Sequence, residues 1–169
     1  FIDPQSAVLE KARIDVQKLL EQHSASSATI EPDAAQSAVW VFVSFSMPNA
    51  SLKALLDASA QTGTPLVLRG MVDGSMQRTL ERLHDLTKRV TPNGPQPTVT
   101  IDPTAYARFA VDKVPSFVFA LEPIRPCERA TCPTPAHLKV SGDVSLSYAL
   151  DMMSSQAKTP TARAQVKAW

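Results

Sequence analysis

The sequence is poor in cysteine, glycine and aromatic residues, and its charges almost cancel. Only 2 of the 169 residues are cysteine, 5 are glycine, and aromatic residues make up 6%. Lysine and arginine number 17 against 16 aspartate and glutamate, which gives a net charge of +1. A nearly neutral chain has no long-range field to attract nucleic acid or anionic lipid. We therefore expect no nucleic-acid partner.

Long apolar runs are also missing. The longest run, from Ala38 to Phe45, is interrupted by Ser44 and followed by Pro48, whereas a membrane-spanning helix needs ~20 apolar residues. We expect no membrane insertion. The chain begins at Phe1, so either an export signal has been removed or the chain was shortened in another way, and both explanations stay open.

Motifs for cofactors, metals and hydrolytic catalysis are absent from the sequence. The five glycines are scattered and form no phosphate-binding loop. The three histidines, His23, His84 and His137, are isolated, with no H-x-x-x-H pair and no Ser/His/Asp pattern. The sequence therefore predicts no cofactor, no metal site and no catalytic residue.

The two cysteines, Cys127 and Cys132, lie close together in a loop bounded by Pro126 and Pro133. Such an isolated pair is typical of a small structural disulfide and hence of an oxidising compartment. A redox couple or half of a zinc site is the alternative. The spacing is not C-x-x-C, and a closed zinc site would need two further ligands.

The two ends of the chain differ from its centre. Asp3 and Pro4 are helix-start residues, and apolar residues at helical spacing predict an amphipathic helix over 4–23. A linker rich in Ser, Ala and Thr follows to residue 37, and the helix could lie apart or pack on the main core. We expect three parts: 1–37, a folded domain over 38–155, and a flexible tail over 156–169.

The central part alternates apolar runs with helical patterns. Strands are predicted at 39–45, 65–70, 98–101, 114–120 and 137–140. Helices are predicted between them and from Leu146 onward, with Gly63 ending the first. The right-handed crossover rule then makes the first two strands parallel neighbours or near neighbours.

The helix after Ser75 has a clear apolar period. We expect its inner face to consist of Met76, Leu80, Leu83 and Leu86.

This order of elements resembles the thioredoxin fold. In that family a dithiol lies where the first central strand meets its helix, and a proline after a cis peptide bond opens a later strand. Here Val114-Pro115-Ser116-Phe117 resembles the proline motif, and Phe45-Ser46-Met47-Pro48-Asn49 occupies the dithiol position without any cysteine. The resemblance implies an α/β fold with a thioredoxin-like central sheet flanked by helices, to which the helix predicted over 4–23 adds an N-terminal helical extension outside the matched part. Without a thiolate there, no nucleophile can attack a disulfide.

Four ordered segments more specifically resemble the TrbC family, the pilin assembly proteins of F-type conjugative transfer, a branch of type IV secretion. The segments are Val43-Ser44-Phe45-Ser46-Met47-Pro48, Leu66-Val67-Leu68-Arg69-Gly70, Ile101-Asp102-Pro103 and Val114-Pro115-Ser116-Phe117. They span residues 39 to about 120. The resemblance implies a periplasmic location, a role in conjugative pilus assembly and a TraW-like periplasmic partner.

The leading functional hypothesis is thus a non-catalytic assembly factor that binds another transfer component. One alternative is a thiol-disulfide oxidoreductase or isomerase that uses Cys127 and Cys132. Another is a chaperone-like protein that binds pilin itself.

Six residues are candidates for partner binding: Ser46, Met47, Pro48, Arg69, Val114 and Pro115. The polar residues at the start of the helix have a plainer explanation, since Ser46 or Asn49 could cap it.

Two other candidates also have plainer explanations. Pro115 could pair with an added strand of a partner or serve the fold alone. Arg69 follows a parallel strand, where open α/β sheets usually bind ligands, so it could bind an anion. An arginine that pairs with a nearby carboxylate, here Asp73 or Asp102, is however the commoner outcome.

Overall fold

A computed structural model describes residues 38–87, 94–125 and 131–169. The helix expected over 4–23 and its linker lie outside the described residues. The elements in chain order are β1 (Val39–Val43), α2 (Asn49–Thr62), β2 (Leu66–Leu68), the 3-10 turn η1 (Val72–Gly74), α3 (Met76–Thr87), β3 (Val99–Ile101), α4 (Pro103–Arg108), β4 (Ser116–Ala120), β5 (His137–Ser141), α5 (Leu146–Gln156) and α6 (Pro160–Ala168).

The five strands form one mixed sheet in the order β3-β2-β1-β4-β5. Strands β1, β2 and β3 run parallel, with Val41 opposite Leu66. Strand β4 runs antiparallel to β1, with Phe42 opposite Ser116, and β5 is antiparallel to β4. The predicted parallel pairing of the first two strands is confirmed, and the segment at 39–45 is joined directly to that at 116–120.

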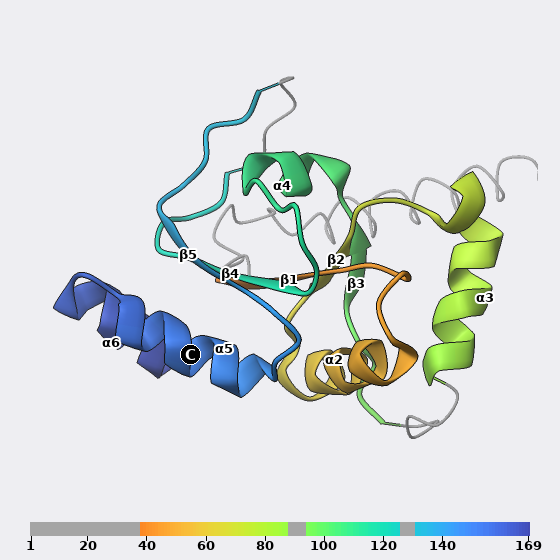
Figure 1. Cartoon of the computed structure of the whole chain (residues 1–169), viewed down its shortest axis with the longest axis horizontal. Coiled ribbons are helices and arrows are strands. Elements are labelled where there is room, and N and C mark those ends of the chain that lie inside the picture. The colour runs from red at the N-terminus through yellow and green to blue at the C-terminus, as the bar shows by residue number, and fades with distance from the viewer. Residues whose placement is uncertain (1–37, 88–93, 126–130) are drawn as a thin grey trace, which may run out of the picture. The chain divides into compact units, whose positions relative to one another are not determined.

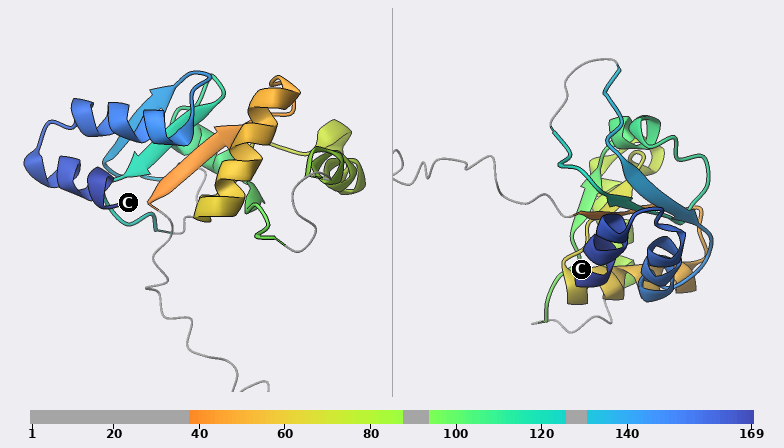
Figure 2. Two further views of the ribbon diagram at one scale, coloured as in Figure 1. Left: turned by 90° about the horizontal axis from the view of Figure 1, so that it is seen from below. Right: turned by 90° about the vertical axis from the view of Figure 1, so that its left-hand side faces the viewer.

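Helices cover both faces of the sheet. Figures 1 and 2 show α2, α5 and α6 on one face and α4 on the other. Because side chains alternate along a strand, Val41 of β1 joins a core with residues of α2 and α5, while Phe42 joins a second core with Tyr106 and Phe109. The run at 39–43 is apolar on both faces for this reason, as the sequence predicted.

Polar side chains fix the ends of several elements. Gly63 ends α2 in the left-handed conformation, at a φ of 72°. The hydroxyl of Ser59, which is 1% exposed, donates to Thr64 O at 2.7 Å and accepts from Thr98 N at 3.0 Å. It thereby joins α2 to the segment that enters β3. Asp102 caps α4 by accepting from Ala105 N at 2.9 Å.

The flexible tail expected over 156–169 is a wrong prediction. Residues Pro160–Ala168 form α6, which packs against α5 and buries Ala162 and Val166. The Thr159 side chain accepts a hydrogen bond from Ala162 N at 3.1 Å, and Pro160 occupies the first turn. A cap followed by proline is a helix-start signal, and it carried more weight than the polar composition. None of the helices in the described ranges is long and apolar enough to cross a bilayer.

The inner face expected for α3 is also partly wrong. Leu86 is buried and Leu83 half-buried, but Met76 is 52% and Leu80 58% exposed. Figures 1 and 2 show α3 beside α2 rather than over the sheet. Only its second half therefore reaches the core.

Candidate protein-binding site

The parallel strands β1 and β2 end side by side, and the segments that follow them enclose a hollow. Its volume is about 300 Å³, and it is lined by Ser44, Phe45, Leu68, Arg69, Gly70, Met71, Val72 and Asp73. Open α/β sheets commonly bind ligands at this edge, beyond the carboxyl ends of their strands. The hollow therefore marks the candidate site.

The segment after β1 forms a turn held by its own hydrogen bonds. Ser44 Oγ lies 2.9 Å from Ser46 Oγ and accepts from Ser46 N at 3.2 Å, while Met47 N donates to Ser44 O at 3.1 Å. The N-cap of α2 is Pro48, which has no side-chain cap. The prediction that Ser46 or Asn49 caps α2 is wrong, because Ser46 bonds to Ser44 and Asn49 Oδ1 accepts from Arg82 at 2.7 Å.

The six residues predicted to bind a partner differ in exposure. Ser46, Pro48 and Arg69 are exposed, and Val114 is half-buried. Met47 and Pro115 are buried, Met47 in the core beneath α2. The Val114–Pro115 peptide bond is cis, and β4 begins directly after it. Met47 and Pro115 thus support the site from within, while the other four remain candidates for contact.

Tyr106 is a site residue for which the sequence analysis predicted no role. Its hydroxyl donates to Val43 O at 2.5 Å and to Val67 O at 3.1 Å. Its ring packs edge-on against that of Phe42, with the ring centroids 4.9 Å apart. Burial raises the pKa of Tyr106 to about 12, against an opposing effect of the Arg69 charge. A tyrosine on the inner face of a helix needs a hydrogen-bond partner for its hydroxyl. This requirement was the signal in the sequence that could have indicated a buried hydrogen bond here.

Arg69 does not form the ion pair expected for it. Asp73 Oδ2 instead accepts from Arg78 Nη1 at 2.9 Å, and Asp102 caps α4. Arg69 is exposed, and within the described parts of the chain its guanidinium has neither a hydrogen bond nor an ion pair. Besides the hollow beside Phe45, it lines a second hollow of about 390 Å³ next to α4.

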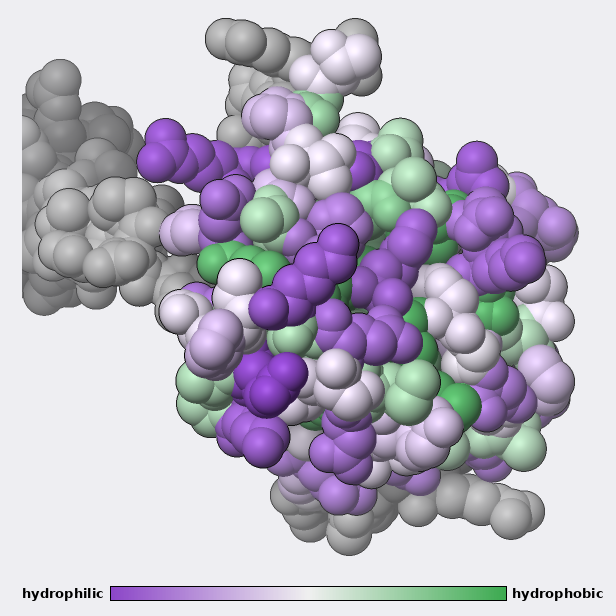
Figure 3. Space-filling model, turned by 60° about the vertical axis from the view of Figure 1, so that its left-hand side comes forward, coloured by the Kyte–Doolittle hydropathy of each residue, from purple (hydrophilic) through white to green (hydrophobic). Residues whose placement is uncertain are grey.

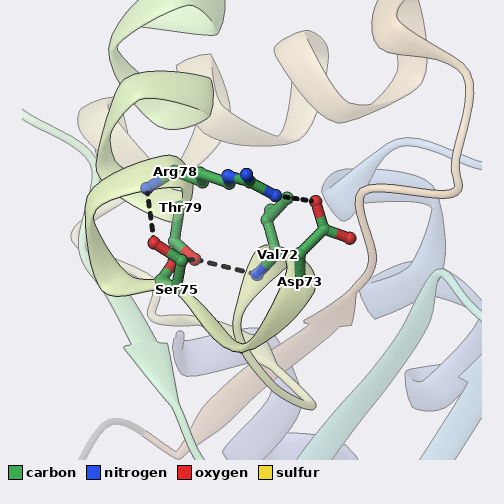
Figure 4. Close-up of polar contacts among 5 residues, drawn as sticks. All are labelled: Val72, Asp73, Ser75, Arg78 and Thr79. Carbon is green, nitrogen blue, oxygen red and sulfur yellow. Dashed lines mark hydrogen bonds and ion pairs between the residues drawn. The ribbon is translucent and has the colours of Figure 1, made fainter.

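Val72 and Asp73, which line the first hollow, belong to a junction between η1 and α3 that hydrogen bonds hold together (Figure 4). Thr79 Oγ1 accepts from Val72 N at 2.9 Å and donates to Ser75 O at 2.7 Å. Ser75 Oγ accepts from Arg78 N at 3.3 Å. Together with the ion pair between Arg78 and Asp73, these bonds fix the start of α3 relative to the hollow.

Three large apolar side chains that precede or belong to the first half of α3 are exposed. Met71 is 43% exposed, Met76 52% and Leu80 58%, and we call these three residues the apolar strip. They are three of the five large hydrophobic residues exposed in the described part of the chain; the others are Tyr148 and Trp169. On the face shown in Figure 3, by contrast, hydrophilic and hydrophobic side chains are interspersed.

Described residues on either side of the cysteine loop are bonded to α4. Arg108 Nε donates to Pro133 O at 2.8 Å and its Nη1 donates to Arg125 O at 3.0 Å, so one side chain holds the chain on both sides of the loop. Cys132 is disulfide-bonded. Cys127, the only other cysteine of the sequence, lies outside the described residues, so their pairing stays a prediction. No cluster of three potential metal ligands occurs among the residues that the structure describes.

Comparison with known proteins places the chain in a family. The model of the family described as "Type-F conjugative transfer system pilin assembly protein" matches residues 41–153, from β1 into α5. The periplasmic protein TrbC of Escherichia coli (strain K12) is 38% identical over 77 residues, which are 46% of this chain and 34% of that protein. The chain thus spans about a third of the length of this relative. No solved structure matches. Since the family match covers more than half of the sequence, the chain belongs to the TrbC family of F-type conjugative transfer pilin assembly proteins.

Proposed function

We propose that the chain is a non-catalytic periplasmic assembly factor of an F-type conjugative transfer system, and that it acts by binding another protein of that system. The proposed partner is a TraW-like periplasmic protein. We propose that the chain makes this contact with a thioredoxin-like domain that begins at residue 38 and includes α6, through the surface at the ends of β1 and β2.

One observation carries this proposal: the apolar strip is exposed beside an arginine that has no ion-pair partner in the described residues. Three of the five large hydrophobic residues that are exposed in the described part of the chain fall between positions 71 and 80, and a concentration of exposed apolar side chains commonly marks an interaction surface. Leaving Met76 and Leu80 in water forgoes burial that would stabilise the fold. A partner that covers them explains why they are there.

The sulfur chemistry of the chain speaks against catalysis. Thiol-disulfide exchange needs a thiolate, and the turn between Ser44 and Pro48 contains none. Cys132 is already bonded and lies on a loop held to α4 by Arg108. A structural disulfide fits an oxidising compartment, which agrees with the periplasmic location in the name of the Escherichia coli relative.

The test is plasmid transfer from donor cells whose copy of this gene is deleted and then replaced. Native chain should restore transfer and should retain the TraW-like protein on co-purification from periplasm. Leu80→Glu should neither restore transfer nor retain the TraW-like protein, because a charge on the apolar strip opposes burial at an interface. Tyr148→Glu is the matched control, since Tyr148 is an exposed apolar residue on α5, and it should behave like the native chain.

Other results would favour the alternatives. Retention of pilin in place of the TraW-like protein would indicate a pilin chaperone. Insulin reduction by the native chain that Cys132→Ser abolishes, with the variant folded by circular dichroism, would indicate a thiol-disulfide enzyme. Full transfer with Leu80→Glu would contradict the proposed surface.

A further inference from the structure

Arg69 stands between two hollows that differ in charge. The first, beside Phe45 and Met71, contains one carboxylate, that of Asp73, and Arg78 already neutralises it at 2.9 Å. The second, next to α4, contains the carboxylate of Asp112, and no ion pair with a described residue compensates it. An incoming anion would be repelled in the second hollow and attracted in the first.

The first hollow also contains apolar side chains in addition to Arg69. Phe45 is half-buried there, and Met71 is 43% exposed. Met71 belongs to the apolar strip, whose other two residues, Met76 and Leu80, are exposed on α3. A ligand bound at Arg69 would therefore meet apolar surface immediately beside the charge, as an arginine at the centre of a protein interface does.

From this arrangement we infer that Arg69 binds a carboxylate side chain of the partner protein, with a neighbouring apolar side chain of the same segment packed on Phe45 and Met71. This inference rests on the proposed function and specifies its chemistry. The guanidinium is a planar fork that pairs with a carboxylate through two parallel hydrogen bonds. Partial desolvation between Phe45 and Met71 makes such a pair stronger than one in open water.

The same arrangement excludes a purely apolar occupant of the first hollow. Covering Arg69 with an apolar surface would remove the guanidinium from water without a compensating hydrogen bond, which is costly. Free inorganic anions would satisfy the guanidinium but leave Met71 and the rest of the apolar strip exposed. An acidic residue next to an apolar one satisfies both parts of the surface.

The experiment titrates the full, isotope-labelled chain with two blocked peptides and follows binding by NMR. One peptide carries a glutamate between two leucines, and the other carries glutamine in its place. The signals of Phe45, Arg69, Gly70 and Met71 should move with the glutamate peptide, and its affinity should exceed that of the glutamine peptide about tenfold. Arg69→Gln should remove this difference. Arg163→Gln, an exposed arginine on α6, is the matched control and should keep it.

Several outcomes would overturn the inference: equal binding of the two peptides, unchanged discrimination in Arg69→Gln, shifts confined to other residues, no binding at millimolar peptide, or displacement of the peptide by equimolar inorganic phosphate. Co-purification separates this failure from failure of the proposed function. If Arg69→Gln retains the TraW-like protein as well as native chain does, only the role of Arg69 is wrong. If the native chain retains no transfer component, the proposed function itself is wrong.

Discussion

The hydroxyl of Tyr106 lies 2.5 Å from the carbonyl oxygen of Val43 and donates a hydrogen bond to it. Tyr106 belongs to α4, whereas Val43 is the last residue of β1. A second contact, at 3.1 Å, joins the same hydroxyl to Val67 O of β2. One side chain therefore fastens α4 to two parallel strands, and the same side chain lines the second hollow together with Arg69. We expect the geometry of the candidate site to depend on this residue.

Replacing Tyr106 with phenylalanine should lower the free energy of unfolding by about 1 kcal/mol at neutral pH, because Val43 O and Val67 O lose the hydrogen bonds from this hydroxyl. The ring and its contact with Phe42 are kept, so the change reports the hydroxyl alone. Urea unfolding of both proteins measures the difference. An equal or higher stability of Tyr106→Phe would contradict the role of these hydrogen bonds.

The same pair of proteins should show a pH dependence. Burial raises the pKa of Tyr106 from 10.0 to about 12 in the folded chain. Below pH 10 the Tyr106 hydroxyl keeps its proton in both the folded and the unfolded chain, so its contribution to stability is complete. Between pH 10 and 12 the hydroxyl loses its proton only in the unfolded chain, and this favours unfolding. The stability difference between native chain and Tyr106→Phe should therefore shrink across this window. Other groups that titrate there occur in both proteins and cancel, and a difference that grows with pH would contradict the assigned sign.

Sequence reasoning found the strands because burial leaves a direct trace in apolar periodicity. The run at 39–43 and the segment opened by Pro115 both contribute to the sheet as predicted. The same reasoning misplaced the first half of α3, since an apolar period shows that a face prefers burial but not what is available to cover it. Met76 and Leu80 lie beyond the reach of the core, and that depends on where α3 packs against α2.

The polar part of the site was harder to predict. A pairing of Arg69 with Asp73 was reasonable because the two residues are close in the sequence. Arg78, however, lies one helical turn along α3 from the same junction and forms the ion pair with Asp73. Likewise the hydroxyl of Ser46 could have capped α2, but the turn places Ser46 Oγ 2.9 Å from Ser44 Oγ. Short polar side chains have several partners within reach, and only the backbone path decides among them.

Ala110 is held in the left-handed conformation, at a φ of 48°, directly after α4 and Phe109. Glycine adopts this conformation without the Cβ clash that an alanine has. Ala110→Gly should therefore raise the free energy of unfolding by about 0.5–1 kcal/mol. Ala107→Gly is the control, because Ala107 is exposed within α4. This substitution should lower the free energy of unfolding by about 0.5–1 kcal/mol, since glycine is a poor helix former. Thermal unfolding should give shifts of opposite sign, and two shifts of the same sign would contradict the argument.

Ser59 should be the most sensitive serine of α2. Its hydroxyl is buried and both donates to Thr64 O and accepts from Thr98 N, so Ser59→Ala leaves two backbone groups without this partner and should cost about 1–3 kcal/mol. Ser51→Ala removes an exposed hydrogen bond to Asp143 on the same helix and should cost less than about 0.5 kcal/mol. Chemical denaturation of the two variants compares them, and equal losses would show that burial is not the deciding factor.

Two leucines of α3 should separate stability from binding. Leu86 is 4% exposed in the core, so Leu86→Ala should lower the free energy of unfolding by about 2–5 kcal/mol, through lost burial and the cavity left behind. Leu80 is 58% exposed, and Leu80→Ala should change stability by less than about 0.5 kcal/mol. If Leu80 contacts the partner, its variant should nevertheless retain less of the TraW-like protein on co-purification. A stable Leu80→Ala that binds normally would mean that the apolar strip is not the contact surface. A destabilised one would mean that α3 packs more closely than its exposure indicates.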